Sequence, residues 1–180
     1  MRLSAALCAS LLSLAAFAAA PAPVQASTAE GASGVEPVFR NAHNAWRVFT
    51  RGEGNERICY AVSRPTESLP ANVTHGEVFF FVSSWASGAA REQPSFLAGY
   101  PLRPDSPPRA RVGSDRFTMF VSQSEGFIEL ERDATRLVNA MRQGAVMRVE
   151  ATSDRGTATV YEFSLSGVTA ALRQVGDLCR

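Results

Sequence analysis

The cysteines are the residues of this chain whose chemistry is easiest to assign from sequence. Cys8 lies in an apolar N-terminal segment with the features of a cleaved signal, which leaves Cys59 and Cys179 in the mature chain. A bridge between them would close a loop of more than a hundred residues. The loop-entropy relation values such a loop at about 4–5 kcal/mol as an upper figure. The alternative is a metal site built on two cysteines, but neither cysteine has a histidine at ligand spacing. The sequence therefore predicts a Cys59–Cys179 disulfide and no metal ligands.

His43 and His75 are the only histidines. Either could act as a general base beside a serine, with Asp154 or Glu125 as the orienting acid. No nucleophile-elbow motif is present, and the chain has no Gly-rich phosphate loop. His43 falls in an expected flexible leader, and His75 falls in a proline-bounded loop where a solvated turn histidine is the simpler interpretation. We therefore predict no catalytic and no cofactor-binding residues and a non-enzymatic protein, with a small hydrolase using His75 as the alternative.

Two other residues are candidates for recognition. Trp85 follows the apolar run 77–83, and loops of a rigid β-fold commonly carry recognition. Arg155, in Arg-Gly-Thr, could bind an anion through its guanidinium and nearby backbone amides, although a tight turn before a strand explains the same residues. The three phenylalanines at 79–81 indicate either an exposed apolar edge or a strand buried on both faces, and we expect the buried strand.

The N-terminal segment predicts export. Arg2 precedes an uncharged apolar stretch, residues 3–20, and Ala26 ends a small-residue cleavage pattern, with Ala20 as an alternative cut. An uncleaved single-pass anchor is the competing interpretation. We expect a signal peptide at 1–26, a flexible leader at 27–41 and one domain at 42–180. The full chain has 18 basic and 17 acidic residues, so removing Arg2 leaves a formally neutral protein. A neutral balance argues against a nucleic-acid partner.

Strand-length β-branched and aromatic runs dominate the rest of the chain, beginning at Trp46. Two short helices are expected. The first is capped by Asp133 and stopped by Gly144, and the second follows Gly167, where Gly176 can end it. The apolar spacings that predict them are Ala134, Leu137, Val138 and Met141, then Val168, Ala171, Leu172 and Val175. About eight short strands with two helices predict a mostly β fold, a β-sandwich.

Several pieces, in order, resemble the invasion-associated locus B proteins, exported bacterial proteins named for a role in host-cell entry. They are Trp46-Arg-Val, Ile58-Cys-Tyr, Gly99-Tyr-Pro, Leu137-Val-Asn-Ala-Met with Gly144, Arg155-Gly-Thr, Phe163-Ser-Leu-Ser-Gly, Ala170-Ala and Cys179. The resemblance implies an immunoglobulin-like β-sandwich, a Cys59–Cys179 bridge and no known catalytic set.

These features lead us to expect an exported protein, periplasmic or secreted and associated with the outer surface. We expect it to act by contacts with an unidentified protein or cell-surface partner, in host-cell interaction or invasion. Beside the hydrolase, a periplasmic chaperone or assembly factor is the other alternative. We expect no cofactor and no stable membrane span once the signal is removed.

Overall fold

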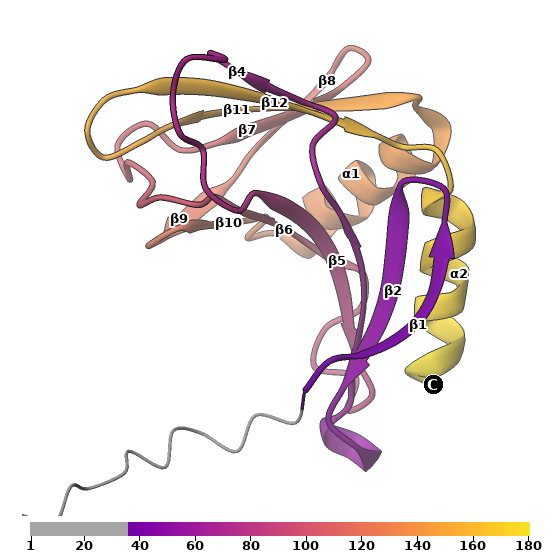
Figure 1. Ribbon diagram of the computed structural model, residues 1–180. Helices are drawn as coiled ribbons and strands as arrows, with labels where there is room; N and C mark the ends of the chain where they lie inside the picture. Colours follow the sequence, from indigo (N-terminus) through magenta and orange to yellow (C-terminus); the bar gives the residue numbers. More distant parts are fainter. Residues whose placement is uncertain (1–35) are drawn as a thin grey trace, which may run out of the picture. The chain divides into compact units, whose positions relative to one another are not determined.

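The computed structural model describes residues 36–180, so the expected signal at 1–26 and the leader up to residue 35 lie outside the described part. The described chain forms two sheets of antiparallel strands and two α-helices (Figure 1). The prediction of a mostly β fold with two short helices is confirmed, and the immunoglobulin-like strand order stays a prediction. None of the helices within residues 36–180 has the length and apolar character that a membrane span requires.

The larger sheet contains seven strands and is built mainly from the first half of the chain. Its strands, in spatial order, are β1 (Val38–His43), β2 (Trp46–Arg51), β3 (Ile58–Ser63), β5 (Phe79–Trp85), β6 (Gln93–Leu97), β10 (Glu125–Phe127) and β9 (Phe120–Ser122). A short 3-10 turn, Gly54–Glu56, joins β2 to β3. The strand β1 begins inside the range expected as leader, so residues 38–41 are part of the sheet and the domain starts earlier than predicted.

The smaller sheet contains five strands. Their order is β4 (Glu67–Leu69), β12 (Ala158–Ser164), β11 (Val146–Thr152), β7 (Arg109–Val112) and β8 (Asp115–Thr118). The single strand expected at 116–122 is divided, because β8 belongs to this sheet and β9 to the larger one. Met119, between them, is buried, so the chain crosses from one sheet to the other at a side chain fixed in the core.

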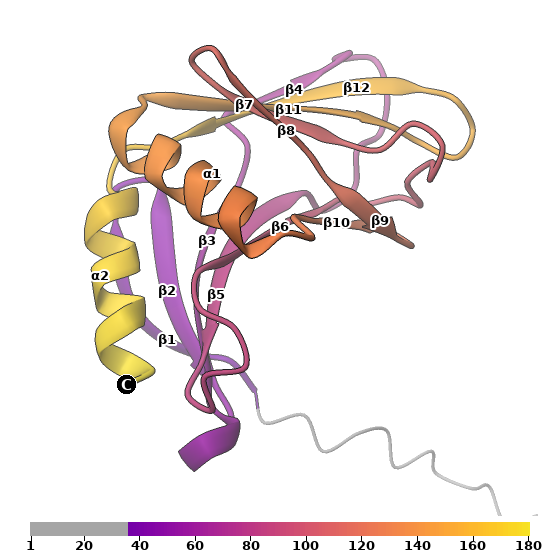
Figure 2. The ribbon, with the colours of Figure 1, turned by 180° about the vertical axis from the view of Figure 1, so that it is seen from behind.

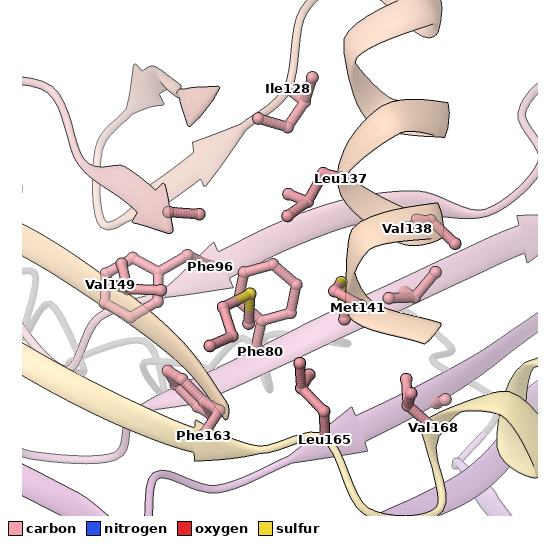
Figure 3. Close-up of a cluster of buried hydrophobic side chains, with 14 of the residues drawn as sticks. Phe80, Phe96, Ile128, Leu137, Val138, Met141, Val149, Phe163, Leu165 and Val168 are labelled. Atoms are coloured by element: carbon pink, nitrogen blue, oxygen red, sulfur yellow. The ribbon is translucent and has the colours of Figure 1, made fainter. Parts of the chain in front are cut away.

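The two helices and the smaller sheet all pack on one side of the larger sheet (Figures 1 and 2). The helix α1 (Glu131–Gln143) lies against β6, β7 and β8, and α2 (Val168–Leu178) lies along β2 and β3. Figure 3 shows the core that results, with Phe80 and Phe96 of the larger sheet beside Val149 and Phe163 of the smaller one. Leu137 of α1 completes it. The other side of the larger sheet has no described element over it.

Helix α1 begins two residues before the predicted cap, so Asp133 lies in its first turn, where it pairs with Arg136 at 3.1 Å. Gly144 ends α1 as predicted, and its N–H donates to the carbonyl of Ala140. Helix α2 continues past Gly176 to Leu178. It starts after Gly167, which has φ +90° and leaves no room for a Cβ, since that atom would lie 2.0 Å from the carbonyl oxygen of His43.

The predicted disulfide is present. Cys59 lies in β3 and Cys179 directly follows α2, with their Cα atoms 5.9 Å apart and both residues buried. The guanidinium of Arg57 donates to the carbonyl of Leu178 at 3.0 Å, which adds a second attachment at the same end of the helix. The bridge therefore holds α2 on the covered side of the larger sheet.

Candidate functional site

The uncovered side of the larger sheet carries apolar side chains where a solvated face would carry polar ones. Strand β5 was expected to be buried on both faces, and this is wrong: Phe80, Val82 and Ser84 are buried, whereas alternate residues are only half-buried. The same alternation holds in β2 and β3. We call this surface the aromatic face and define it as Phe39, Phe49, Ile58, Tyr60, Val62, Phe79, Phe81, Trp85, Leu97 and Phe127.

Cross-strand pairing arranges these side chains in contact. Phe49 is paired with Phe39 on β1 and with Tyr60 on β3. The rings of Phe49 and Tyr60 stack with centroids 5.6 Å apart, and Phe39 meets Phe49 edge-on at 5.5 Å. Tyr60 lies 5.8 Å from Phe81, which lies 5.8 Å from Phe79. Contacts of this kind stabilise a sheet and make a continuous ridge of rings across four strands.

Two hollows flank this ridge, and each combines an apolar floor with arginine. One, of about 350 Å³, is lined by Ile58, Tyr60, Phe81 and Trp85 together with Arg51 and, from β10, Glu125. The other has a volume of about 340 Å³. Burial raises the pKa of Tyr60 above the ordinary value for a tyrosine, and the nearby charge of Arg51 opposes that rise. The charge of Arg51 is therefore close enough to the ridge to affect the Tyr60 hydroxyl.

The second hollow is lined by Phe49, Val62 and Phe79 together with Arg47 and Arg64. The guanidinium of Arg64 lies 4.6 Å from the centroid of the Phe79 ring, a cation–π contact, and also pairs with Glu77 at 2.6 Å. Within residues 36–180, Arg47 and Arg51 form no ion pair. The aromatic face therefore carries three arginines, of which only Arg64 is in an ion pair within the described chain, and one further carboxylate, Glu125, lies in the hollow of Arg51.

The structure places Trp85 at the end of β5, so it is not the loop residue that the sequence suggested. It pairs with Ile58 across the sheet and lines the hollow beside Arg51. Trp85 was expected to serve recognition from a loop, whereas it is a strand residue of the aromatic face. Sequence reasoning missed Phe49, Tyr60 and Phe81 as surface residues. The available signal was the odd spacing of Trp46 and Phe49 in β2, which puts an aromatic on each side of one strand.

Neither histidine sits in a triad. His43 is the last residue of β1, not part of a leader, and its Nε2 lies 2.7 Å from the side-chain oxygen of Gln174 on α2. His75 is not simply solvated: its Nε2–H donates to the carbonyl of Pro70 at 3.1 Å, and its Nδ1 lies 2.8 Å from the Tyr161 hydroxyl. Neither ring contacts a serine or a carboxylate among its hydrogen-bond partners in the described chain.

Arg155 lies, as expected, in a turn, formed by residues 153–156 before β12, and it is exposed. It lines a second kind of depression, a polar cavity of about 490 Å³. The other lining residues are Val73, Thr74, Gly99, Tyr100, Pro101, Ser153, Asp154, Thr157 and Thr159. At its inner wall the Tyr100 hydroxyl lies 2.6 Å from that of Thr159 and 2.9 Å from that of Tyr161. Burial and the hydrogen bond with Tyr100 raise the pKa of Tyr161 well above its ordinary value.

No cluster of histidine, cysteine, aspartate and glutamate suited to a metal ion occurs in the described part of the chain. Comparison with known proteins adds no assignment, since no family model, curated protein or solved structure matches the chain. The aromatic face and the cavity beside Arg155 are the two candidate surfaces of the described chain.

Proposed function

We propose that this chain is an exported protein that binds a protein partner through its aromatic face. The observation that carries the proposal is a continuous ridge of aromatic rings on the uncovered side of the larger sheet. Phe39 is exposed and the other rings of the ridge are half-buried, and a contiguous apolar patch that stays partly open to solvent is typical of interaction sites. Covering it would gain roughly 25 cal/mol per Å² of apolar surface removed from water.

The charges on the face favour an acidic partner segment. Arg47 and Arg51 alternate with Phe49 along β2, so positive charge and apolar surface repeat at the two-residue spacing of an extended strand. A segment that carries acidic and apolar side chains in turn at every second residue, all on the side that faces the sheet, would place its apolar groups in the hollows and its carboxylates on the guanidinium groups. Arginine and aromatic residues are also those that most often dominate interface energies.

Export is supported by the N-terminal segment and by the disulfide. Disulfides persist in oxidising compartments and are rare in the cytosol. The resemblance to invasion-associated locus B proteins extends the proposal to contacts at the cell surface, including contacts with a host cell. Cell fractionation with N-terminal sequencing tests this part. The expected result is a shortened chain in the periplasm or medium, and recovery from the cytoplasm with Met1 intact would contradict export.

The partner class can be tested with two synthetic extended peptides that carry serine at every second position. One has leucine and glutamate in turn at the positions between the serines, and the other has leucine and lysine there. Trp85 lines a hollow of the face, whereas Trp46, the other tryptophan of the chain, is fully buried. Changes in tryptophan fluorescence therefore report on contact with the face. We expect the acidic peptide to bind saturably. The basic peptide should bind at least tenfold more weakly, a difference of about 1.4 kcal/mol in binding free energy.

Matched variants separate the face from the rest of the surface. The double variant Tyr60→Ser/Phe81→Ser should abolish the response, and Arg47→Ala/Arg51→Ala should remove the preference for the acidic peptide. Val146→Ser, at an exposed position of the smaller sheet, and Arg111→Ala serve as controls. Equal binding of both peptides would favour the chaperone alternative. Binding only to anionic lipid vesicles, or self-association lost in the double variant, would contradict a protein partner of this kind.

A further inference from the structure

The polar cavity beside Arg155 has the size and lining of a site for a small molecule. Its volume of about 490 Å³ lies within the usual range of ligand pockets. Three separate parts of the chain form it, namely the loop after Pro70, the segment Gly99–Pro101 and the turn before β12. The turn is fixed from within, because the N–H of Gly156 donates to the carbonyl of Ser153 and that of Thr157 to the Ser153 hydroxyl.

The mouth of the cavity carries one charge of each sign. Asp154 and Arg155 both line it, and within residues 36–180 neither side chain forms an ion pair or a hydrogen bond. The nearby Arg103 is already engaged, since its guanidinium donates to the carbonyl of Asp154 at 2.8 Å and lies 3.8 Å from the carboxylate of Asp105. Adjacent residues of opposite charge that do not neutralise each other suit a ligand that carries both charges.

The inner wall can offer hydroxyl lone pairs to the same ligand. With His75 neutral, its Nε2–H is directed to Pro70, so the Tyr161 hydroxyl donates to Nδ1, Tyr100 donates to Tyr161, and Thr159 donates to Tyr100. The opposite direction, in which the Thr159 hydroxyl donates to the carbonyl of Ala151 at 3.2 Å, requires a second proton on His75, at Nδ1, to donate to Tyr161. In either direction the hydroxyl hydrogens stay within the chain of hydrogen bonds, so Tyr100 and Thr159, which line the cavity, offer lone pairs that accept from a polar side chain.

We propose that this cavity binds a free α-amino acid with a polar side chain. The carboxylate of the amino acid pairs with Arg155, whose guanidinium can hold it with two parallel hydrogen bonds. The ammonium group pairs with Asp154, and the polar side chain reaches the hydroxyl groups of Tyr100 and Thr159. This site is separate from the aromatic face and does not depend on the function proposed there.

The proposal can be tested by measuring thermal stabilisation of the purified protein by each proteinogenic amino acid, since a ligand of the folded state raises its stability. The best ligand is then compared by calorimetry with two analogues, its carboxamide and its α-hydroxy acid. Each analogue lacks one charge. We expect each to bind about 10- to 100-fold more weakly, as for the loss of one charged hydrogen-bonded contact.

Two variants connect each charge to its partner. Arg155→Ala should bind the amino acid and its carboxamide equally, and Asp154→Asn should bind the amino acid and its hydroxy acid equally. Tyr100→Phe should weaken the binding of a polar amino acid more than the binding of alanine. Arg111→Ala, on the outer face of the smaller sheet, should leave the binding affinity unchanged. The proposal is overturned if no amino acid saturates the protein up to roughly 50 mM. Undiminished binding of both analogues, or binding of neutral sugars alone, would also overturn it.

Discussion

The two sheets have outer faces built by the same alternation of residues but with opposite chemistry. On the smaller sheet, Arg148 lies 3.3 Å from Glu150 and 3.6 Å from Glu162, and Arg111 is paired with Arg148 across the strands. On the larger sheet the equivalent positions carry the aromatic face. The smaller sheet thus has the charged outer face that water stabilises. The larger sheet has a face that would gain free energy from being covered, and this contrast separates scaffold from binding surface.

The largest expected effect comes from truncating a side chain on the covered side of β5, compared with truncating its neighbour on the aromatic face. Phe80 is fully buried between the sheets, so Phe80→Ala should lower the free energy of unfolding by about 3–5 kcal/mol. Phe81→Ala, one residue on, removes only contacts within the aromatic face and should cost about 1 kcal/mol or less. Denaturant unfolding of both variants measures the difference. Equal losses would mean that the aromatic face is covered in solution.

The covered side of the larger sheet also depends on the bridge that holds α2. Replacing both cysteines in Cys59→Ala/Cys179→Ala should lower the free energy of unfolding by about 2–5 kcal/mol, because the unfolded chain gains the freedom that the bridge removes. Unfolding of the original protein with and without reductant provides the comparison. In native, unreduced protein that has lost its signal, thiol titration should detect no free cysteine, and detection of two would contradict the bridge.

The smallest effect is expected on the charged face. Arg148→Ala should cost at most about 1 kcal/mol, since exposed ion pairs contribute little. The loss should shrink further at high salt, where such pairs are screened. Arg111→Ala, which removes no ion pair in the described chain, is the matched control for unfolding measured at two salt concentrations. A large, salt-independent loss for Arg148→Ala would mean that this face is packed and not solvated.

Features set by local spacing were predictable from sequence. The i, i+3, i+4 and i+7 apolar residues of α2 and the stop at Gly144 follow from positions along the chain and are present. The Cys59–Cys179 bridge spans 120 positions and was predictable for a different reason, because only two cysteines remain beyond the N-terminal segment. The division of the run 116–122 between two sheets was not predictable. Its residues favour strand throughout, and only packing around the buried Met119 determines where the chain changes sheet.

The candidate sites show the same limit. The consecutive phenylalanines at 79–81 give no alternation of apolar and polar residues, so whether one face stays open is decided by which elements cover the sheet. Arg155 was recognisable as a turn residue, but its cavity needs Tyr100 and Thr159, which lie far from one another in sequence. The contact of His75 with Tyr161 likewise spans 86 positions and has no local pattern.

The bridge also determines how the protein would respond to mechanical force. Residues 59–179 form a covalently closed ring that contains most of both sheets and both helices. A pull applied between residue 36 and Cys179 could extend only the segment before Cys59. When fully extended, its roughly 23 residues span about 80 Å. That segment consists of β1, β2 and the turn before β3, so tension would strip one edge of the aromatic face. The polar cavity lies within the ring and would be spared from that extension.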